Sequence, residues 1–423
     1  ALYSPRALTL PDFGFLEPLH QTPYFSGMNL ILFDHPEIRQ NLLPFTFTRP
    51  VAGIRVGILT LAEKWEKHLT LKASFSTENY LSEKFSLTTT SDNLWINGAV
   101  CPTPELVQAI LKLKTDEALQ QGEYLIAARC ADTNIPDLKA KKSQPFSAVL
   151  TLIDQVWKIY QHNGAQIRED FSLLTTGRKS APLTDEHTRV YNPSQIFLEE
   201  GAKVKAAVLN AENGPIYLGK NSLVQEGALI RGPFALCEES HVNMGAKVRG
   251  DTTVGPYSKI GGEVSNSVLF GYSSKAHDGF LGNSVLGEWC NIGADTNTSN
   301  LKNNYENIKL WNYAKGGFKD TGLMFCGLMF GDHSKCGINT MFNSGTVVGV
   351  SASIFGDGYP RNFIPSFAWG GAAGFTTYQL NKAFETAAKA MERRNIALNE
   401  VDKAILKKIF EDSAQHRAWE KKS

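Results

Sequence analysis

The side chain best suited to acid–base chemistry in the C-terminal half is His277, in the segment Lys275-Ala276-His277. Imidazole titrates closest to neutral pH among the side chains, so His277 could act as a general base. Upstream lies Arg249, and a guanidinium group can bind a phosphate through two parallel hydrogen bonds. Both residues also have simpler interpretations, as a histidine on a surface turn and a solvent-facing cation, and the sequence leaves these alternatives open.

A second group of charged residues follows a short apolar segment near the N-terminus. Residues 29–34 (NLILFD) predict a buried strand, and Asp34, Arg39 and Arg49 come at its end or soon after it. One carboxylate and two guanidinium groups could form a phosphate or metal site. The alternative is that this domain has lost any catalytic function and is retained for assembly. The metal itself is unknown at this stage.

The elements that must position His277 and Arg249 are visible as an apolar repeat. Aliphatic side chains recur at every sixth position, in Val224, Ile230, Leu236, Val242, Val248, Val254 and Ile260. Mostly small residues precede them by two, namely Ser222, Ala228, Phe234, Ser240, Ala246, Thr252 and Ser258. This spacing fits neither a helix nor an ordinary strand. It is typical of a parallel β-helix, in which three hexapeptides close one coil and the aliphatic residues stack inside.

The repeat changes phase near residues 264–268 and resumes later in a second register. The second register comprises Met324, Phe330, Cys336, Phe342, Val348 and Ile354. Between the registers, residues 297–322 predict an irregular loop extruded from the coil. Beyond Gly374, apolar residues at helical spacing predict two amphipathic helices that cap the open end of the β-helix.

The remaining segments predict an α/β domain before the β-helix. Strand-like patterns (29–34, 94–96, 124–128, 149–153) alternate with helix-like patterns (54–68, 105–113), as in a doubly wound fold. We therefore expect this domain at 28–153, a connecting helix and linker at 154–190, the β-helix at 191–372 and helices at 373–423. Residues 1–27 contain four prolines and predict a poorly structured or appended extension, with Met28 as the natural start.

Composition narrows the classes of partner. The 423 residues include 43 basic and 42 acidic ones, so the charge balance favours neither nucleic acid nor an anionic membrane as a partner. The six cysteines form no C-x-x-C pair, which argues against a zinc ribbon or a disulfide scaffold and favours a reducing, cytoplasmic location. No apolar run approaches the roughly 18 residues of a membrane helix.

Several motifs give the C-terminal half a family resemblance. They are Arg249-Gly250, Gly262-Glu263-Val264, Ser274-Lys275-Ala276-His277, Phe280-Leu281-Gly282, Asn291-Ile292-Gly293-Ala294 and residues 296–300. In order and spacing they resemble the acetyltransferase half of the bifunctional UDP-N-acetylglucosamine pyrophosphorylase/glucosamine-1-phosphate N-acetyltransferases. Gly337-Ile338-Asn339 is more similar to the archaeal sugar-1-phosphate nucleotidyltransferase/acetyltransferase branch. The resemblance implies a left-handed β-helix that works as a homotrimer, with sites at subunit contacts.

The resemblance also implies roles for individual residues. His277 matches the catalytic base, and Ala294 and Ile338 match positions whose backbone contacts acetyl-CoA. The sugar phosphate would be bound by Arg249, Lys275, Phe280, Asn291 and Asn300. Three departures are evident, because the family's K-A-G-H segment is one glycine shorter here, its tyrosine is Phe280, and a family lysine is Ser265. The loss of these polar groups weakens the predicted phosphate site and leaves the acceptor sugar open.

The N-terminal domain resembles sugar nucleotidyltransferases, with larger departures. Residues 43–52 (LPFTFTRPVA) are similar to the family element L-R-P-L-T-x-x-R-P-K-P, but Val51 replaces the lysine. The family's glycine loop has become residues 33–39, which retain only Arg39. This opening typifies a divergent bacterial branch that is assigned as an alternative form of the bifunctional enzyme. It implies binding of a nucleoside triphosphate and Mg²⁺ near Asp34, Arg39 and Arg49.

Three functional hypotheses follow. The first is acetyl transfer from acetyl-CoA to glucosamine 1-phosphate or a similar amino sugar phosphate, coupled to nucleotidyl transfer that yields a UDP-sugar. The second is nucleotidyl transfer alone, with the β-helix as a trimerising stalk. The third is a non-catalytic regulatory or assembly subunit with a degenerate N-terminal domain. The sequence leaves open the nucleotide, the sugar and the survival of both activities.

Overall fold

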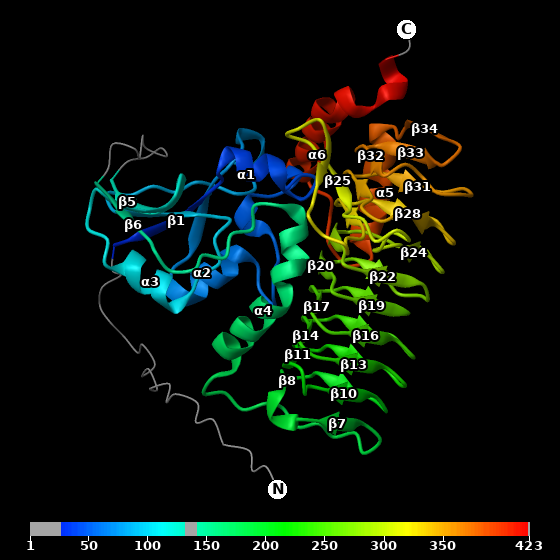
Figure 1. Cartoon of the computed structure of the whole chain (residues 1–423), viewed down its shortest axis with the longest axis horizontal. Coiled ribbons are helices and arrows are strands. Elements are labelled where there is room, and N and C mark those ends of the chain that lie inside the picture. The colour runs from blue at the N-terminus through cyan, green and yellow to red at the C-terminus, as the bar shows by residue number, and fades with distance from the viewer. Residues whose placement is uncertain (1–26, 132–141, 422–423) are drawn as a thin grey trace, which may run out of the picture.

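The computed structural model describes residues 27–131 and 142–421. The predicted extension at 1–27 therefore lies, apart from Gly27, outside the described residues. An α/β domain lies beside a β-helix, with α4 between them and the two C-terminal helices near the last coils (Figure 1). This arrangement confirms the predicted order of an α/β domain, a parallel β-helix and terminal helices. Among the described helices, none has both the length and the apolar character needed to cross a membrane.

The α/β domain is built on one mixed sheet with the strand order β2-β1-β3-β5-β4-β6. Strand β1 is parallel to β2 and β3, whereas β5 is antiparallel to both of its neighbours. The strands are β1 (Asn29–Phe33), β2 (Ala73–Ser76), β3 (Asn93–Asn97), β4 (Glu117–Gln121), β5 (Tyr124–Cys130) and β6 (Lys142–Pro145). The helices are α1 (Pro36–Asn41), α2 (Leu61–Leu69) and α3 (Pro104–Leu111), with short 3-10 turns at Phe45–Phe47, Val51–Gly53 and Asn79–Leu81.

Two of the predicted elements in this domain are wrong in extent or type. The helix predicted at 54–68 begins only at Leu61, because Thr60 caps it by accepting from the Glu63 backbone N–H while Glu63 accepts from the Thr60 backbone. The strand predicted at 149–153 is an irregular segment that contributes one isolated bridge, between Leu152 and Val100. The other predicted strands and the helix at 105–113 are confirmed to within a few residues.

Helix α4 (Val156–Thr175) confirms the predicted connecting helix and joins the two halves. Its Asp170 forms a buried ion pair with Lys64 of α2 and accepts from the backbone N–H of Ile58. On the other side, Asn163 donates to the Asp251 carbonyl of the β-helix at 2.9 Å. Helix α4 is therefore bonded to both parts of the chain.

The β-helix has three parallel sheets, one on each side of its coils. The first contains β7 (Arg189–Tyr191), β10 (Val208–Asn210), β13 (Leu229–Arg231), β16 (Lys247–Arg249), β19 (Glu263–Ser265) and β22 (Phe280–Gly282). The second contains β8 (Ile196–Leu198), β11 (Ile216–Leu218), β14 (Phe234–Leu236), β17 (Thr252–Val254), β20 (Val268–Gly271), β23 (Val285–Glu288), β27 (Met329–Phe330), β30 (Val347–Val348) and β32 (Phe363–Ile364).

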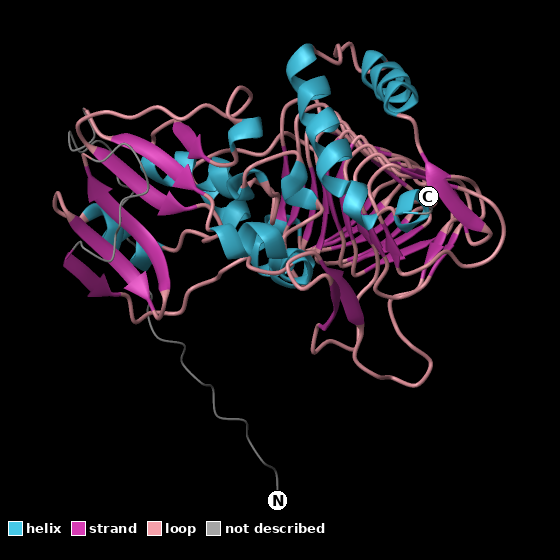
Figure 2. Cartoon of the chain, turned by 90° about the horizontal axis from the view of Figure 1, so that it is seen from above, coloured by secondary structure: helices cyan, strands magenta, loops and turns pink. Residues whose placement is uncertain are grey.

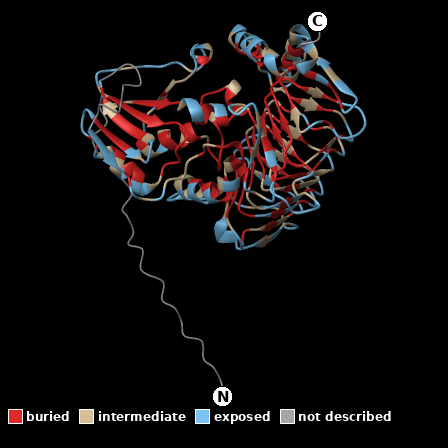
Figure 3. Cartoon of the chain, turned by 45° about the horizontal axis from the view of Figure 1, so that its top comes forward, coloured by how far each residue is buried: buried red, intermediate tan, exposed pale blue. Residues whose placement is uncertain are grey.

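The third side is formed by two successive groups of strands. These are β9 (Lys203–Val204), β12 (Leu223–Val224), β15 (His241–Val242), β18 (Lys259–Ile260) and β21 (Ser274–Lys275), then β28 (Lys335–Cys336), β31 (Ser353–Ile354) and β33 (Ala368–Gly371). The last strand on this side, β34 (Gly374–Thr377), is antiparallel to β33. Strand β24 (Asn297–Thr298) pairs with β29 (Met341–Phe342). All seven aliphatic residues of the predicted repeat are at most 2% exposed, which confirms the β-helix interior (Figure 3).

The phase change and the second register have structural causes. The coil between β17 and β20 is shorter than its neighbours, since Thr253 pairs with both Ala235 and Val268. The second register is confirmed from Phe330 to Ile354, whose side chains are buried. The prediction that Met324 belongs to this register is wrong, because Met324 is 43% exposed and precedes the point where the chain re-enters the coil at β27.

The predicted loop at 297–322 is a structured excursion. The chain leaves the coil after β24, forms a hairpin of β25 (Lys309–Asn312) and β26 (Gly317–Asp320), and returns at β27. Ile308 and Leu310 are buried in the same apolar core as the α/β domain. Asn312 donates to the Asn41 side chain of α1 at 2.9 Å. The excursion therefore attaches the β-helix to the α/β domain.

The C-terminal helices α5 (Leu380–Glu392) and α6 (Glu400–Asp412) are confirmed as helices but do not cap the β-helix as predicted. Their apolar faces pack with Leu81 of the α/β domain and with Val350 and Phe367 of the last coils. They therefore lie beside the last coils, against the corner that carries Val350 and Phe367, and reach the α/β domain at Leu81 (Figure 2). Strand β34 pairs with β33 at the end of the coils, where Trp419 stacks on Phe375.

A buried ionic contact joins the two halves. Arg49 of the α/β domain binds Asp332 of the β-helix through both terminal nitrogens, at 3.1 and 2.6 Å, and lies 3.2 Å from Glu288. We expect Arg49→Met to lower the free energy of unfolding by about 3–5 kcal/mol, because it leaves Asp332 buried without its cation. Thermal and urea unfolding would measure the change.

The matched control is Lys382→Met, which breaks an exposed pair with Glu385 on α5. It should cost less than about 1 kcal/mol, since exposed ion pairs contribute little. Equal effects of the two substitutions would contradict the assigned importance of Arg49.

Candidate functional site

His277 lies on the turn that joins β21 to β22, at an outer corner of the β-helix. Its side chain is exposed, and within the described chain no hydrogen bond or ion pair involves the imidazole. An imidazole in this position can accept a proton from a molecule bound at the corner. The geometry is therefore compatible with the predicted role of a general base.

The backbone of this turn, residues 276–279, is held by neighbouring coils. Asn243 donates to the Ala276 carbonyl at 2.9 Å, and the Glu263 N–H donates to the Gly279 carbonyl at 3.2 Å. A Cβ at Gly261 would lie 2.2 Å from the Ala276 carbonyl oxygen, so only glycine fits in the preceding coil. The exposed imidazole thus stands on a closely packed turn whose four carbonyl groups all accept hydrogen bonds.

Three other predicted residues lie on the sheet that contains β22. Arg249, at the end of β16, has a side chain that is 70% exposed and pairs with Glu263 at 3.0 Å. The Phe280 ring and the Asn300 amide both lie over Gly282, where a Cβ would be 2.5 Å from one and 2.8 Å from the other. Ser265 of β19 pairs with Arg249 on one neighbouring strand and with Gly282 on the other, so the three residues lie in line across the sheet. These residues form one cluster on one side of the β-helix.

Ala294 and Ile338 follow His277 along the same corner in later coils. The Asp295 N–H donates to the Asp278 carbonyl at 3.1 Å, and the Asn339 N–H donates to the Ala294 carbonyl at 2.8 Å. Ile338 is 70% exposed. The three predicted residues therefore form a row along one edge.

Asn291 and Lys275 lie apart from this cluster within one chain. Asn291 bridges Ser274 and Lys335 on the third sheet. Lys275 is 1% exposed, and its ammonium donates to the carbonyls of His277 and Asp278 from inside the β-helix. The position of Lys275 corrects the prediction of direct substrate contact, since the alternation of the strand directs this side chain inward.

The N-terminal cluster of Asp34, Arg39 and Arg49 is buried and engaged internally. Asp34 accepts from Arg39 at 2.8 Å, from Thr77 at 2.6 Å and from the backbone N–H of Val51 at 2.8 Å. Arg39 also donates to the carbonyl oxygens of Thr46 and Arg49. Burial raises the pKa of Asp34, and the neighbouring Arg39 opposes that effect.

These contacts bear on the predicted nucleotide site. The three residues lie close together, as expected, but their polar atoms bond to the protein and Arg49 is bound by Asp332. Val51, at the position of the family's lysine, is fully buried. Within the described residues, no group of three or more His, Cys, Asp or Glu side chains could hold a metal. The arrangement therefore does not favour a phosphate or Mg²⁺ site formed by these three side chains.

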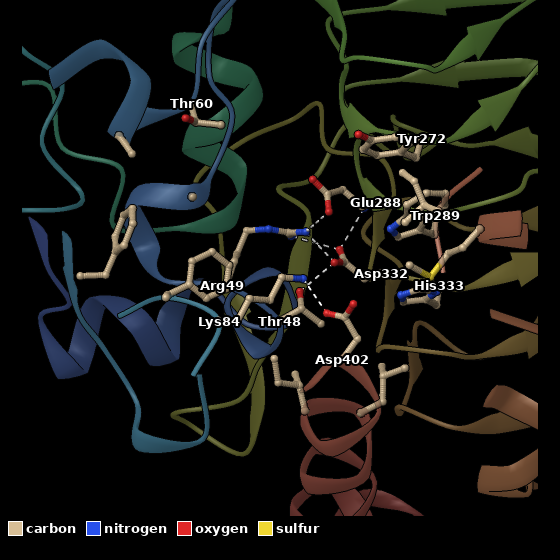
Figure 4. Close-up of a pocket in the computed structure, with 18 residues that line it drawn as sticks. Thr48, Arg49, Thr60, Lys84, Tyr272, Glu288, Trp289, Asp332, His333 and Asp402 are labelled. Carbon is tan, nitrogen blue, oxygen red and sulfur yellow. Dashed lines mark hydrogen bonds and ion pairs between the residues drawn. The ribbon is translucent and has the colours of Figure 1, made fainter. Parts of the chain in front are cut away.

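Sequence reasoning missed a cavity of about 410 Å³ between the α/β domain, the β-helix and the C-terminal helices. Figure 4 shows Arg49 and Lys84 reaching toward it from one side, opposite Glu288, Trp289 and His333. Lys84 pairs with Asp402 of α6 at 2.7 Å. No local signal could reveal this cavity, because its lining comes from segments far apart in the sequence.

An aromatic ladder borders the cavity. The rings of Tyr257, Tyr272, Trp289 and His333 stack in that order, with centroids 5.1, 4.3 and 6.3 Å apart. All four residues have left-handed backbone angles, with φ between 54° and 62°. Burial, assisted by the nearby Lys335, lowers the pKa of His333 to about 3. His333 is therefore neutral at neutral pH and acts as part of the stack.

Comparisons with known proteins agree with the motifs. Residues 30–179 match the sequence profile of a family described as "Sugar nucleotidyl transferase". "Bifunctional protein GlmU" of Ralstonia pickettii (strain 12J) is 26% identical over 231 residues, covering 48% of this chain and 47% of the relative. The "Bifunctional sugar-1-phosphate nucleotidylyltransferase/acetyltransferase" of Sulfurisphaera tokodaii is 29% identical over 160 residues, or 37% of each chain. The chain spans about half the length, or less, of these curated relatives.

The predicted family resemblance is thus confirmed, and with it the fold class of a nucleotidyltransferase-like domain followed by a left-handed parallel β-helix. The Sulfurisphaera relative is named as a nucleotidylyltransferase/acetyltransferase and the matching family as a sugar nucleotidyl transferase, which supports a transferase role. Among solved structures, the "polySia specific acetyltransferase NeuO" is 15% identical and covers 46% of this chain and 85% of its own, with a TM-score of 0.25. That likeness is too low to bear on function.

The buried Lys275 gives a pH prediction. Burial lowers its pKa to about 8, although Asp278, Cys336 and Asp295 act in the opposite direction. Between pH 8 and about 10.4 the unfolded chain therefore binds more protons at this lysine than the folded chain does. We expect the wild type to gain up to about 3 kcal/mol of unfolding free energy relative to Lys275→Met as pH rises through this window.

Urea unfolding of both proteins at pH 7, 8, 9 and 10 would measure the difference. Lys220→Met removes an exposed lysine and is the control, for which the difference from wild type should not change with pH. A pH-independent difference for Lys275→Met as well would contradict a depressed pKa for Lys275.

Proposed function

We propose that this protein works in amino-sugar nucleotide biosynthesis, and that its β-helix transfers acetyl from acetyl-CoA to the amine of glucosamine 1-phosphate or a similar amino sugar phosphate. The observation that carries the proposal is the exposed imidazole of His277, on a turn whose carbonyl groups all accept hydrogen bonds and which leads into the strand of Phe280 and Gly282. The motifs shared with bifunctional acetyltransferase relatives support the same assignment.

In the proposed reaction, the sugar nitrogen attacks the thioester carbonyl of acetyl-CoA. A new C–N bond forms, the C–S bond breaks, and coenzyme A leaves as the thiol. His277 accepts the proton that the amine loses and returns it to the sulfur of the leaving group, so the step consumes no net proton. Arg249 exchanges its exposed contact with Glu263 for the sugar phosphate, and Asn300 offers an amide to the sugar beside Phe280. The backbone at Ala294 and Ile338 would hold acetyl-CoA along the corner.

The site is proposed to be completed by a second subunit of a homotrimer. Asn291 lies on the third sheet of the same chain, away from Arg249, so a neighbouring copy is needed to bring these two residues to one ligand. Met244 and Ile338, on the same corner as His277, are 72% and 70% exposed, and such apolar side chains are suited to a subunit contact.

Nucleotidyl transfer is the second candidate function, favoured by the profile match over residues 30–179. It would couple the sugar phosphate to a nucleoside triphosphate with Mg²⁺. Release of pyrophosphate from UTP and N-acetylglucosamine 1-phosphate with Mg²⁺ tests it. Acetyl transfer without pyrophosphate release would instead support an assembly role for the α/β domain, in keeping with the internal bonds of Asp34, Arg39 and Arg49.

The primary test is thiol release from acetyl-CoA with glucosamine 1-phosphate. We expect His277→Ala to lower kcat by roughly 10²–10⁴-fold, because one positioned base is lost. His187→Ala, an exposed histidine near the start of the β-helix, is the control and should retain activity. Wild-type protein without turnover would reject this acceptor, and turnover that survives His277→Ala would remove His277 from the mechanism.

A second test addresses phosphate binding. Arg249→Met should raise KM for the sugar phosphate by roughly 10–100-fold with a smaller change in kcat, because a charge-assisted hydrogen bond is lost. Arg231 ends the adjacent strand β13 and is also exposed, so Arg231→Met is a matched control. A KM that rises equally in both variants would indicate a general charge effect and not a phosphate contact.

A further inference from the structure

One interior position of the β-helix holds a lysine where its neighbours are apolar. The inward residues of the third side before and after it are Val242, Ile260, Ile292, Cys336 and Ile354, all at most 5% exposed. Lys275 pairs with Ile260 in parallel register and is itself 1% exposed. An ammonium group is costly to bury, and an unbranched apolar side chain would fill the same space. Its presence therefore calls for a specific role.

Both hydrogen bonds that the Lys275 ammonium donates within the described chain go to the turn that carries His277. It donates to the carbonyl of His277 and, at 3.1 Å, to the carbonyl of Asp278. Asp278 has a second donor, the Asp295 N–H. Within the described chain, the His277 carbonyl receives a hydrogen bond from Lys275 alone. His277 is thus held from inside by its backbone while its imidazole points outward.

The surrounding coils leave this turn little freedom. A Cβ at Gly262, in the coil before, would lie 2.9 Å from the His277 carbonyl oxygen. Gly279 has φ +108°, and a Cβ there would lie 2.1 Å from the Thr296 carbonyl in the coil after. Without the ammonium, the His277 carbonyl would lose the donor that the described chain gives it, and the turn would no longer be held from inside the β-helix.

We infer that Lys275 is a positioning residue, which holds the His277 imidazole in the geometry needed for proton transfer without touching a substrate. The inference rests on the proposed acetyl transfer. It also replaces the direct substrate contact expected for Lys275, because the side chain is enclosed between Ile260 and Ile292. A displacement of about 1 Å in a reacting group can cost on the order of 10²-fold in rate, so loss of this support should be measurable.

The test is Lys275→Met, which keeps an unbranched side chain one atom shorter and removes the charge. We expect kcat for thiol release to fall by roughly 10–10²-fold, with KM for both substrates changed by less than about twofold. Ile354→Val is the matched control, since it removes one methyl group from the same interior row, far from the turn. It should leave kcat unchanged even where it lowers the melting temperature.

A second readout does not depend on acetyl transfer. The His277 imidazole signal can be assigned in histidine-labelled protein by NMR, by comparison with His277→Ala. In Lys275→Met this signal should broaden or split, whereas Ile354→Val should preserve it. If wild-type protein does not transfer acetyl, the proposed function fails, and the NMR signal alone decides the positioning role.

A lower kcat together with a changed His277 signal in Lys275→Met, and neither in Ile354→Val, supports the inference. An unchanged kcat and an unchanged signal in Lys275→Met overturn it. An equal fall of kcat in both variants also overturns it, because general loosening of the core would then be the cause.

Discussion

The coils of the β-helix have to lie flat against one another, because each strand pairs in parallel register with the strand of the next coil. Neighbouring strands are about 4.8 Å apart, so equivalent side chains of successive coils are in contact. Every position in the hexapeptide is therefore repeated as a row along the molecule. Inward rows are mostly apolar, with Lys275 as an exception, whereas outward corner rows are free to carry other chemistry. The aromatic ladder ending at His333 and the edge that carries His277 are two such rows.

This constraint explains how much of the molecule the sequence could predict. The inward row from Val224 to Ile260 was predictable because stacking imposes an unbroken period. Met324 fitted the same period without belonging to a coil, because a pattern alone does not show where the chain leaves the solenoid. The strand predicted at 149–153 failed for a related reason, since short apolar segments do not distinguish a strand from an irregular buried segment.

The candidate site was predictable in part. Residue types identified His277 and Arg249, and the structure places both on the outer surface of the β-helix. The inward direction of Lys275 was hidden by the shortened coil before it, which breaks the count from Ile260. The sequence also did not reveal that Arg49 forms an ion pair within the protein, because its partner Asp332 comes from a distant segment. Pairings of this kind depend on the packing of two domains and leave no local pattern.

Arg49 and Lys275 are both buried cations, but the groups that surround their charges differ. Arg49 meets the carboxylate of Asp332, so its charge is neutralised and the contact fixes one domain on the other. Lys275 meets only backbone carbonyls and forms no ion pair within the described chain, so burial depresses its pKa although the carbonyl dipoles solvate its charge. A counter-ion would itself have to be desolvated and accommodated between coils that leave no room at Gly262 and Gly279. An ammonium that bonds two carbonyls holds the turn from within and leaves the outer corner at His277 open to a ligand.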